Sequence, residues 1–208
     1  MIKIDIRDSL LQTIEPKHPF VFELWESPVP VVVLGSSQKP ENEVHLHLCN
    51  HDGVTVVKRR GGGGAVVLTA GVLCITLAFH STTSISPYYY FKKINAFIID
   101  TLERHFLIEG LNVAGISDIA IGEQKILGCS MFKSRQNFLY QGSLLVNPDL
   151  PNIYKYLKHP SKEPDYRKGR SHEQFLTSLE KAGYPLVPQQ VKGVIEQELK
   201  RNFIVIIS

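Results

Sequence analysis

Residues 58–66 read Lys-Arg-Arg-Gly-Gly-Gly-Gly-Ala-Val, a basic strand end that runs directly into four consecutive glycines. Glycine loses more backbone freedom on folding than any other residue, so such a run is unfavourable unless a ligand approaches the backbone or φ is positive. Successive N–H groups can converge on an anion, and adjacent arginines add bidentate donors. The stretch predicts a phosphate or carboxylate site, with a flexible loop beside a solvated basic face as the alternative. Its glycine spacing fits neither a Walker A loop nor a Rossmann fingerprint.

Runs of apolar and β-branched residues on both sides of this loop predict strands. We expect them at Val31–Gly35, Val54–Lys58, Val66–Val67, Val72–Phe79, Val113–Ile121, Gln124–Met131 and Phe138–Val146, with a turn at Gly122-Glu123. Helical spacing predicts helices at Glu43–Cys49, Tyr88–Phe106, Asn152–Leu157, His172–Ala182 and Val191–Asn202, and Phe203–Ile207 reads as a terminal strand. Strands dominate the middle without strict βαβ alternation, which predicts an α+β fold with a mixed β-sheet in a single domain, residues 1–208.

The composition is typical of a soluble globular protein. Of 208 residues, 43% are hydrophobic and 21% are charged, and the net charge of +3 is too small to indicate nucleic acid. The N-terminus lacks the apolar core of a secretory signal, and no apolar run is long enough to span a bilayer. Three cysteines without metal-ligand spacing indicate free thiols in a reducing compartment. We therefore expect a cytoplasmic protein with no metal-binding residues and no nucleic-acid or membrane partner.

Three further segments carry residue types suited to binding or chemistry. Asp118 precedes Lys125–Ser130, where a lysine between apolar residues can neutralise charge on a carboxylate–phosphate anhydride. The alternatives are a surface lysine and a turn aspartate. Gly142 lies inside a predicted strand, where it allows close approach of a ligand to the backbone or marks a bulge. The basic segment Pro164–His172 suits a phosphate, an acidic protein face or solvent, and Ser171 is a natural helix N-cap.

In this order and spacing, the segments resemble the lipoate–protein ligase A family. Residues 58–66 match the family's Arg-rich strand end and GGGAV-type loop. Asp118, Lys125–Ser130 and Gln141–Leu145 fall in register with its Asp, its Lys-Ile-x-Gly-x-Ala segment and its His-Gly-x-Leu-Leu strand. Further matching stretches are Val31–Pro40, Asn147–Leu150 and the Tyr-Arg-x-x-Arg-x-His-x-x-Phe pattern at Tyr166–Phe175. The resemblance implies a biotin/lipoate protein ligase-like catalytic domain, with a mixed sheet flanked by helices.

The resemblance also implies a two-step reaction. Lipoate reacts with ATP, with Mg²⁺ as cofactor, to give lipoyl-AMP, and the lipoyl group then passes to a lysine of a carrier domain. The expected acceptor is the lipoyl domain of a 2-oxoacid dehydrogenase subunit or the glycine cleavage H protein. Lys125 would be the catalytic lysine that contacts the carboxylate and the α-phosphate. The implied substrate- and adenylate-binding residues are Arg59, Arg60, Gly62, Gly63, Gly64, Ala65, Asp118, Gly128, Gln141 and Gly142.

The chain departs from the family pattern at several positions. The serine expected before the last three glycines is Gly61, and the histidine expected before Gly142 is Gln141. Full-length ligases of the family carry a C-terminal accessory domain, for which this chain is too short, so adenylation would need a separate accessory subunit or would not occur. Cys129 is interpreted as a packing residue rather than a nucleophile. Two alternatives stay open: an octanoyl or lipoyl transferase that uses no ATP, and a non-catalytic relative that binds a lipoyl domain or a nucleotide.

Overall fold

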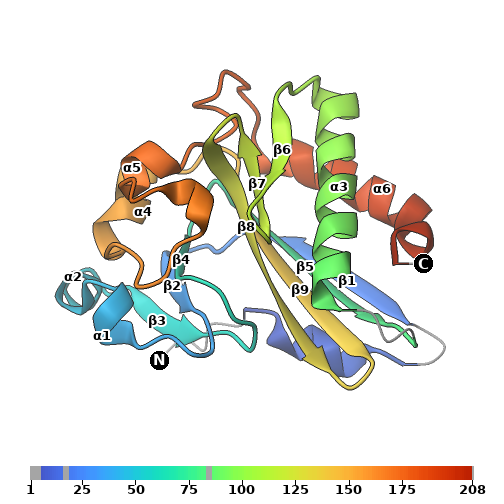
Figure 1. The fold of residues 1–208 in the computed structure, drawn as a ribbon, viewed down its shortest axis with the longest axis horizontal. Helices are drawn as coiled ribbons and strands as arrows, with labels where there is room; N and C mark the ends of the chain where they lie inside the picture. Colours follow the sequence, from blue (N-terminus) through green and yellow to red (C-terminus); the bar gives the residue numbers. More distant parts are fainter. Residues whose placement is uncertain (1–5, 16–18, 83–85, 208) are drawn as a thin grey trace.

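Two β-sheets form the centre of the computed structural model, which describes residues 6–15, 19–82 and 86–207, the last five by their backbone alone (Figure 1). In the described residues the large sheet has the order β1-β5-β9-β8-β7-β6, and every neighbouring pair is antiparallel. Its strands are β1 (Phe20–Trp25), β5 (Val72–His80), β6 (Leu111–Ala114), β7 (Asp118–Ile121), β8 (Gln124–Ser134) and β9 (Asn137–Leu145). The small sheet has the order β3-β2-β4, formed by β2 (Val31–Leu34), β3 (Thr55–Lys58) and β4 (Val66–Leu68).

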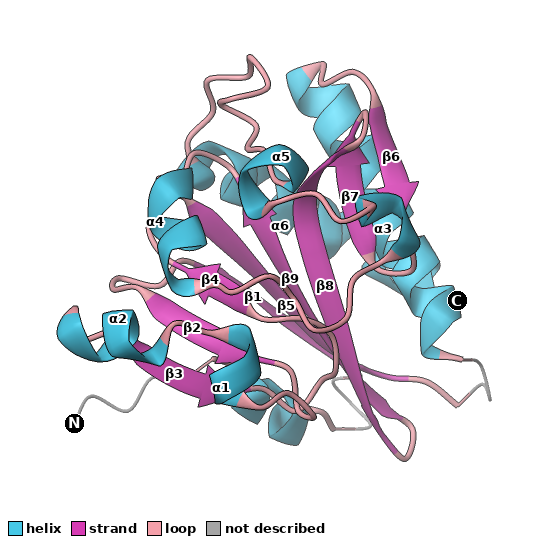
Figure 2. Cartoon of the chain, turned by 60° about the vertical axis from the view of Figure 1, so that its left-hand side comes forward, coloured by secondary structure: helices cyan, strands magenta, loops and turns pink. Residues whose placement is uncertain are grey.

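Helices and the small sheet cover opposite faces of the large sheet. The long helices α3 (Pro87–Phe106) and α6 (Pro188–Ile207) pack on one face (Figure 1). The small sheet lies against the other face, with α2 (Leu46–His51) and α4 (Leu150–Tyr156) packed on it (Figure 2). The remaining helices are α1 (Pro40–Glu43), α5 (His172–Phe175) and the 3-10 helices η1 (Asp8–Thr13) and η2 (Asp165–Arg167). The predicted α+β fold is confirmed, and mixed strand directions occur in the small sheet, where β2 runs parallel to β3 and antiparallel to β4.

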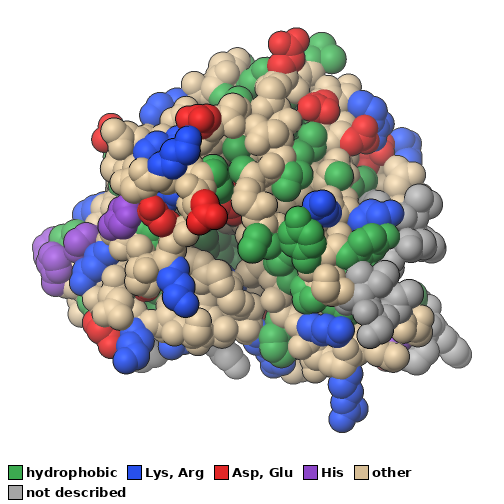
Figure 3. Space-filling model, viewed as in Figure 1, with side chains coloured by type: hydrophobic (Ala, Val, Ile, Leu, Met, Phe, Trp, Pro, Cys, Tyr) green, Lys and Arg blue, Asp and Glu red, His purple; other side chains and the backbone are tan. Residues whose placement is uncertain are grey.

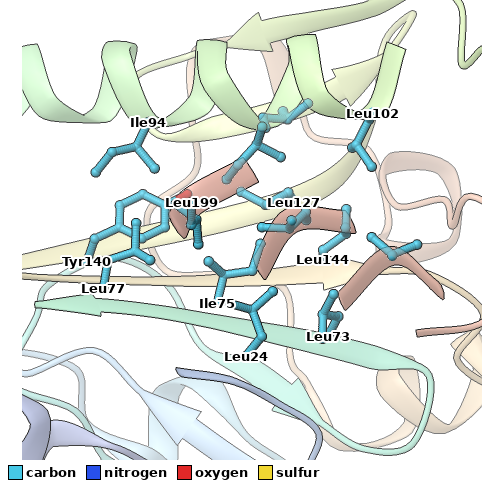
Figure 4. Close-up of a cluster of buried hydrophobic side chains, with 14 of the residues drawn as sticks. Leu24, Leu73, Ile75, Leu77, Ile94, Leu102, Leu127, Tyr140, Leu144 and Leu199 are labelled. Carbon is cyan, nitrogen blue, oxygen red and sulfur yellow. The ribbon is translucent and has the colours of Figure 1, made fainter. Parts of the chain in front are cut away.

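Strand β5 shows how alternation along one strand serves two cores. Ile75 and Leu77 point toward α3 and α6 and join the cluster drawn in Figure 4. Val72 and Cys74 point the other way and pack with residues of the small sheet. Successive strand side chains face opposite sides of a sheet, so a strand covered on both faces is apolar along its whole length. The strand predicted at Val72–Phe79 is therefore confirmed, and its alternation separates the helix-packed core from the face that carries the candidate site.

Helix α3 begins and runs as its sequence predicts. Pro87 occupies the first turn, where the lack of an N–H carries no penalty. Its fully buried apolar residues recur every four positions, at Tyr90, Ile94, Ile98 and Leu102. This spacing places one stripe of the helix against the large sheet.

The strand predicted at Val113–Ile121 is wrong as a single element. The structure has two short antiparallel strands here, β6 and β7, joined by a turn at Gly115. Gly115 has a φ of +58°, a conformation that favours glycine, and its position inside an apolar run hid the turn. Asp118 therefore opens β7 directly after the turn, beside β8, instead of lying in the middle of a strand.

The helix predicted at His172–Ala182 is too long. Ser171 caps the helix through a capping box with Gln174, as its position suggested, but α5 ends at Phe175. After it, the Thr177 N–H donates to the carbonyl oxygen of Lys125 at 3.0 Å. Pairing with the backbone of β8 replaces the helical hydrogen bonds, so a tertiary contact ends the helix.

Three other elements differ from the expectations. The helix predicted at Glu43–Cys49 is interrupted, because Val44 is extended and forms a β-bridge with Leu157. Phe203–Ile207, predicted as a strand, continues α6, since no glycine or proline separates it from the preceding helical turn. The strand β1 was not predicted, although five of its six residues are apolar or aromatic, and neither was the short helix η1.

The described surface carries both signs of charge. Figure 3 shows Lys and Arg side chains scattered among Asp and Glu side chains on the face drawn there. Among the described residues, no helix combines the length and the apolar content needed to cross a membrane.

Candidate active site

A cavity of about 660 Å³, its open mouth included, lies between the two sheets. Residues of β2, β4 and the glycine loop form one wall, and the large sheet forms the other. Strand register places Gly128, Ser143, Cys74 and Trp25 side by side on four neighbouring strands of that sheet. Three of these side chains are small, which leaves room for a ligand, and the Trp25 indole ends the row. With strands about 4.8 Å apart, the row is roughly 14 Å long.

A second cavity of about 510 Å³ adjoins the first and is lined mainly by apolar residues of β4, α4 and α5. Its basic and titratable lining residues are Lys125, Arg167 and His172. Both cavities share a set of lining residues, namely Ala65, Val66, Lys125, Gly128 and Ser143. Lys125 therefore stands at the junction of a chamber with small floor residues and a chamber with apolar walls.

Contacts on both its backbone and its side chain hold Lys125 at this junction. Its carbonyl oxygen accepts the Thr177 N–H, and its Nζ lies 3.0 Å from Oδ1 of the buried Asp118. The other Asp118 oxygen accepts the Tyr166 hydroxyl at 2.7 Å. Burial, followed by the nearby Asp118 carboxylate, raises the pKa of Tyr166 well above its usual range, so the hydroxyl remains a proton donor. The ammonium is thus held beside Asp118, at the junction of the two cavities.

Gly128 makes the position of the lysine side chain possible. A Cβ built on Gly128 would lie 2.5 Å from the Lys125 Nζ and 2.6 Å from its Cε. The aliphatic stem and the ammonium therefore lie directly over the glycine, in space that any other residue would fill.

We expect Gly128→Ala to displace the Lys125 ammonium from Asp118 and to lower activity by roughly ten- to hundred-fold, the range for losing a hydrogen bond to a charged group. The free energy of unfolding should also fall, because the buried Asp118 carboxylate loses its ion-pair partner, but by less than on removal of the lysine, since the displaced atoms belong to a flexible side chain. Steady-state kinetics and urea unfolding of the same preparation test this. Wild-type activity in the variant would show that the ammonium does not need this position.

Arg59 supports the glycine loop from inside. Its Nη2 donates to the carbonyl oxygens of Gly62 and Gly64 at 2.6 and 2.8 Å, and its Nε donates to the Gly62 oxygen at 3.2 Å. Burial lowers the pKa of the guanidinium to about 10, which leaves it charged at neutral pH. Because these donors are taken up by loop carbonyls, Arg59 shapes the loop whose residues Gly63 and Ala65 line the cavity.

Gln141 and Arg60 both contact the N-terminal segment. The Gln141 Nε2 donates to the carbonyl oxygen of Ile6 at 2.9 Å and to Oδ1 of Asp8 at 3.1 Å. The Arg60 Nε lies 4.0 Å from Oδ2 of Asp8, with its side chain half-exposed. Gln141, at the position of the family's histidine, thereby attaches Ile6 to the edge of the cavity, which both residues line.

Gly142 and Cys129 are neighbours on β9 and β8, and packing accounts for both. Gly142 pairs regularly with Cys129, so no bulge forms there, and a Cβ on Gly142 would lie 3.1 Å from the Tyr140 ring. The Cys129 Sγ donates to the carbonyl oxygen of Ser117 at 2.7 Å. Burial raises the pKa of the Cys129 thiol to about 12, which disfavours the thiolate that a nucleophile requires. These contacts agree with the interpretation of Cys129 as a packing residue.

Gly61 and Ser130 face each other across the cavity edge. The family pattern has a serine at the first position and an alanine at the second, and this chain has a glycine and a serine. A Cβ built on Gly61 would lie 2.9 Å from the Ser130 Oγ and 3.1 Å from its Cβ. The Ser130 side chain therefore occupies the space that a side chain at residue 61 would need.

Most of the residues predicted from the sequence meet at the first cavity. Its lining includes Arg59, Gly63, Gly64, Ala65, Asp118, Lys125, Gly128, Gln141 and Gly142. Arg60 and Gly62 are not among its lining residues. Sequence reasoning missed Trp25, Thr76 and Ser130, which also line it. The alternation of β5 predicts that Thr76 and Cys74 share one face of the strand. It does not predict that this face lines a cavity, because the cavity is formed by the small sheet packed opposite.

Comparison with known proteins places this arrangement in a family. Residues 2–200 match the model of the lipoyl protein ligase A/B catalytic domain. Lipoate–protein ligase 1 of Plasmodium falciparum is 30% identical over 157 residues, which is 72% of this chain and 36% of that protein. The chain spans less than half the length of the curated relatives reported for it.

Solved structures share the fold. A bipartite lipoate protein ligase from Thermoplasma acidophilum, studied with its E2 lipoyl domain, superimposes with a TM-score of 0.81 at 18% identity, over 94% of this chain and 76% of that one. A lipoate–protein ligase A bound with ATP gives a TM-score of 0.78 at 18% identity, over 94% of this chain and 77% of that one. The family match extends over nearly the whole sequence, and the chain belongs to the lipoyl protein ligase A/B catalytic domain family.

Proposed function

We propose that this chain catalyses the ATP-dependent attachment of lipoate, through lipoyl-AMP, to a lysine of a lipoyl carrier domain. The observation that carries the proposal is the position of Lys125 at the junction of two cavities that differ in character. An acyl-adenylate also has two parts of different character, an acyl chain and a nucleotide, which are joined at one anionic acyl-phosphate group. A fixed ammonium there would neutralise the charge that develops as the anhydride forms and breaks.

The cavity between the sheets suits the acyl chain. Its floor row from Gly128 to Trp25 leads away from the Lys125 ammonium across four strands. The row of roughly 14 Å is long enough for an octanoyl or lipoyl chain. The Trp25 indole, held by a 3.2 Å hydrogen bond from its Nε1 to the Thr76 hydroxyl, would limit the chain length that fits.

The second cavity suits the nucleotide. Arg167 lines it, its side chain is 5% exposed, and its Nη2 has no hydrogen-bond partner among the described residues. A buried N–H group without a partner is unfavourable, so this atom is best explained by an anionic group of a ligand. The guanidinium also stacks on the Phe175 ring, at 4.7 Å, which holds it in the cavity wall. Arg167 and Lys125 together would hold a phosphate between them.

The reaction has two steps. The lipoate carboxylate attacks the α-phosphorus of ATP, an oxygen–phosphorus bond forms, and the bond to pyrophosphate breaks. The uncharged amine of the acceptor lysine then attacks the acyl carbon, AMP leaves, and the amine loses a proton. Mg²⁺ would enter with the ATP, because it is usually held by substrate phosphates with one or two carboxylates. In both steps Lys125, fixed by Asp118, would stabilise negative charge on the oxygens at the reacting centre.

The carrier domain and the location of the protein are also inferred. The acceptor would be the lipoyl domain of a 2-oxoacid dehydrogenase subunit or the glycine cleavage H protein. The bipartite nature of the T. acidophilum ligase supports a separate accessory subunit as a partner in adenylation. A cytoplasmic location stays a prediction.

Mass spectrometry of an apo lipoyl domain tests the proposal directly. The domain is incubated with the chain, lipoate, ATP and Mg²⁺, and a mass gain of one lipoyl group on its lysine is the expected result. A gain only with octanoyl carrier protein and without ATP would indicate the transferase instead. No gain from either donor, in the presence of a cognate accessory subunit, would indicate a binding-only relative.

We expect Arg167→Leu to raise the KM for ATP by roughly ten- to hundred-fold, the range for losing hydrogen bonds to a charged group, while the KM for lipoate changes little. Leucine retains an apolar contact with Phe175, so the fold should persist. Lys168→Ala, an exposed neighbour with 71% side-chain exposure, is the matched control. An unchanged KM for ATP in Arg167→Leu would remove the nucleotide from the second cavity.

A further inference from the structure

The Ser130 hydroxyl is a buried polar group that the fold itself does not use. The residue is 5% exposed, lines the cavity between the sheets, and its Oγ has no hydrogen-bond partner among the described residues. Burying a hydroxyl without a partner is unfavourable, and an alanine at the same place on β8 would avoid that penalty. The hydroxyl therefore needs a partner that is absent from the folded chain alone, and its position in the cavity lining indicates a bound ligand.

The chain also makes space for this hydroxyl. Gly61, the first glycine of the loop, lies so close that a Cβ there would be 2.9 Å from the Ser130 Oγ. The φ of Gly61 is not positive, so its backbone conformation does not itself demand glycine. The need for glycine at this position follows from the Ser130 side chain. The space between residues 61 and 130 therefore has room for one serine side chain, on either residue 61 or residue 130, but not for a serine at both positions.

The position along β8 identifies the part of the ligand that Ser130 can reach. Ser130 follows Gly128 by two residues on the same face of the strand, a separation of about 7 Å. The Lys125 ammonium lies over Gly128, so the hydroxyl and the ammonium are separated by about the same distance along the strand. A carboxyl or phosphoryl group that accepts one hydrogen bond of about 2.8 Å at each side spans roughly this gap. The hydrocarbon part of an acyl chain offers no acceptor.

We propose that the Ser130 hydroxyl binds an oxygen at the activated, acyl-phosphate end of the substrate, opposite Lys125, and that Gly61 is glycine to admit it. The proposal rests on the function inferred above, because it places the acyl-phosphate group between the two cavities. Ser130 is then a substrate-binding residue that shares its ligand with Lys125. The hydroxyl at the edge of the glycine loop then comes from Ser130 of β8, and not from residue 61 of the loop itself.

The test is isothermal titration of a stable lipoyl-adenylate analogue, with a sulfamoyl group in place of the phosphate, because binding needs no turnover. We expect Ser130→Ala to weaken binding by roughly ten- to hundred-fold, the range for a hydrogen bond to a charged or strongly polarised group. Its thermal stability should be equal to or above that of the wild type, since the hydroxyl has no partner in the fold. Ser134→Ala, an exposed serine on the same strand, should bind like the wild type.

Exchange of the two residues separates ligand binding from a structural role. Gly61→Ser alone should bind poorly, because its Cβ would overlap the Ser130 side chain. The double variant Gly61→Ser/Ser130→Gly carries the hydroxyl on the other side of the gap and should recover binding to within about threefold of the wild type. Loss of affinity in Ser130→Ala without recovery in the exchange variant, or equal affinity in Ser130→Ala, would overturn the assignment of Ser130. Failure of the wild type to bind the analogue would overturn the acyl-adenylate function itself.

Discussion

Lys125→Ala is expected to lower the rate of lipoyl transfer by at least 10²- to 10³-fold, the usual effect of removing one group that stabilises charge in the transition state. The ammonium is the cation that both cavities share, and it is paired with Asp118 and lies directly over Gly128 of β8. Single-turnover kinetics with preformed lipoyl-AMP would report the transfer step, and pyrophosphate release would report adenylation. Both steps should slow, because negative charge develops in both on the oxygens of the acyl-phosphate group beside Lys125.

The variant also removes the partner of the buried Asp118, and an unpaired buried carboxylate destabilises a fold. Lys125→Met combined with Asp118→Asn removes both charges, so it should recover stability without recovering activity. Lys133→Ala, an exposed lysine on the same strand, is the matched control and should leave both properties unchanged. Full activity in Lys125→Ala would show that the ammonium does not take part in the chemistry.

The local pattern of the chain predicts most of its strands and the long helix α3. The apolar period of α3 and the alternation of β5 are properties of contiguous residues, so they can be read without knowing the fold. The turns that were missed depend on context. Gly115 interrupts an apolar run with a positive φ, and α5 stops where Thr177 pairs with Lys125. Backbone hydrogen bonds to a distant strand are not encoded in the spacing of nearby side chains.

The candidate site is also predicted in part. The glycine loop, Asp118 and Lys125 were predicted from the resemblance to a family in which the same motifs occur in the same order, and in the structure they lie around one cavity. The roles of two basic residues were less visible. Arg59 is engaged with loop carbonyls, and Arg60 lies beside Asp8, so a basic pair in sequence becomes one supporting residue and one half-exposed residue. Ser130 becomes noticeable only when the distance to Gly61 is known.

Gly35→Ala is expected to have the largest effect on stability, because it introduces an atom where backbone already stands. A Cβ on Gly35 would lie 2.1 Å from the carbonyl oxygen of Gly63, and the next nearest atoms, at 3.1 and 3.3 Å, are backbone carbons of Gly63 and Gly62. No side-chain rotation can relieve this overlap, so the end of β2 and the glycine loop must separate. Overpacking of a well-packed region typically costs about 1–3 kcal/mol, and contact with backbone places this variant at or above the upper end.

Separation of the loop would also disturb the site. The Ser36 N–H donates to the Gly61 carbonyl oxygen at 3.0 Å. Arg59 donates to the Gly62 and Gly64 carbonyl oxygens and, through Nη1, to the Val33 carbonyl oxygen of β2 at 3.4 Å, so these hydrogen bonds tie the loop to the end of β2. Urea unfolding should give a lower midpoint with an unchanged slope, and affinity for the lipoyl-adenylate analogue should fall with it. Gly193→Ala is the control, because this glycine lies inside α6 with no neighbouring atom within 4 Å of an added Cβ, and alanine there should be neutral or stabilising by about 0.5–1 kcal/mol. If Gly35→Ala unfolded at the wild-type midpoint and bound the analogue normally, the close contact between β2 and the glycine loop would not determine the shape of the site.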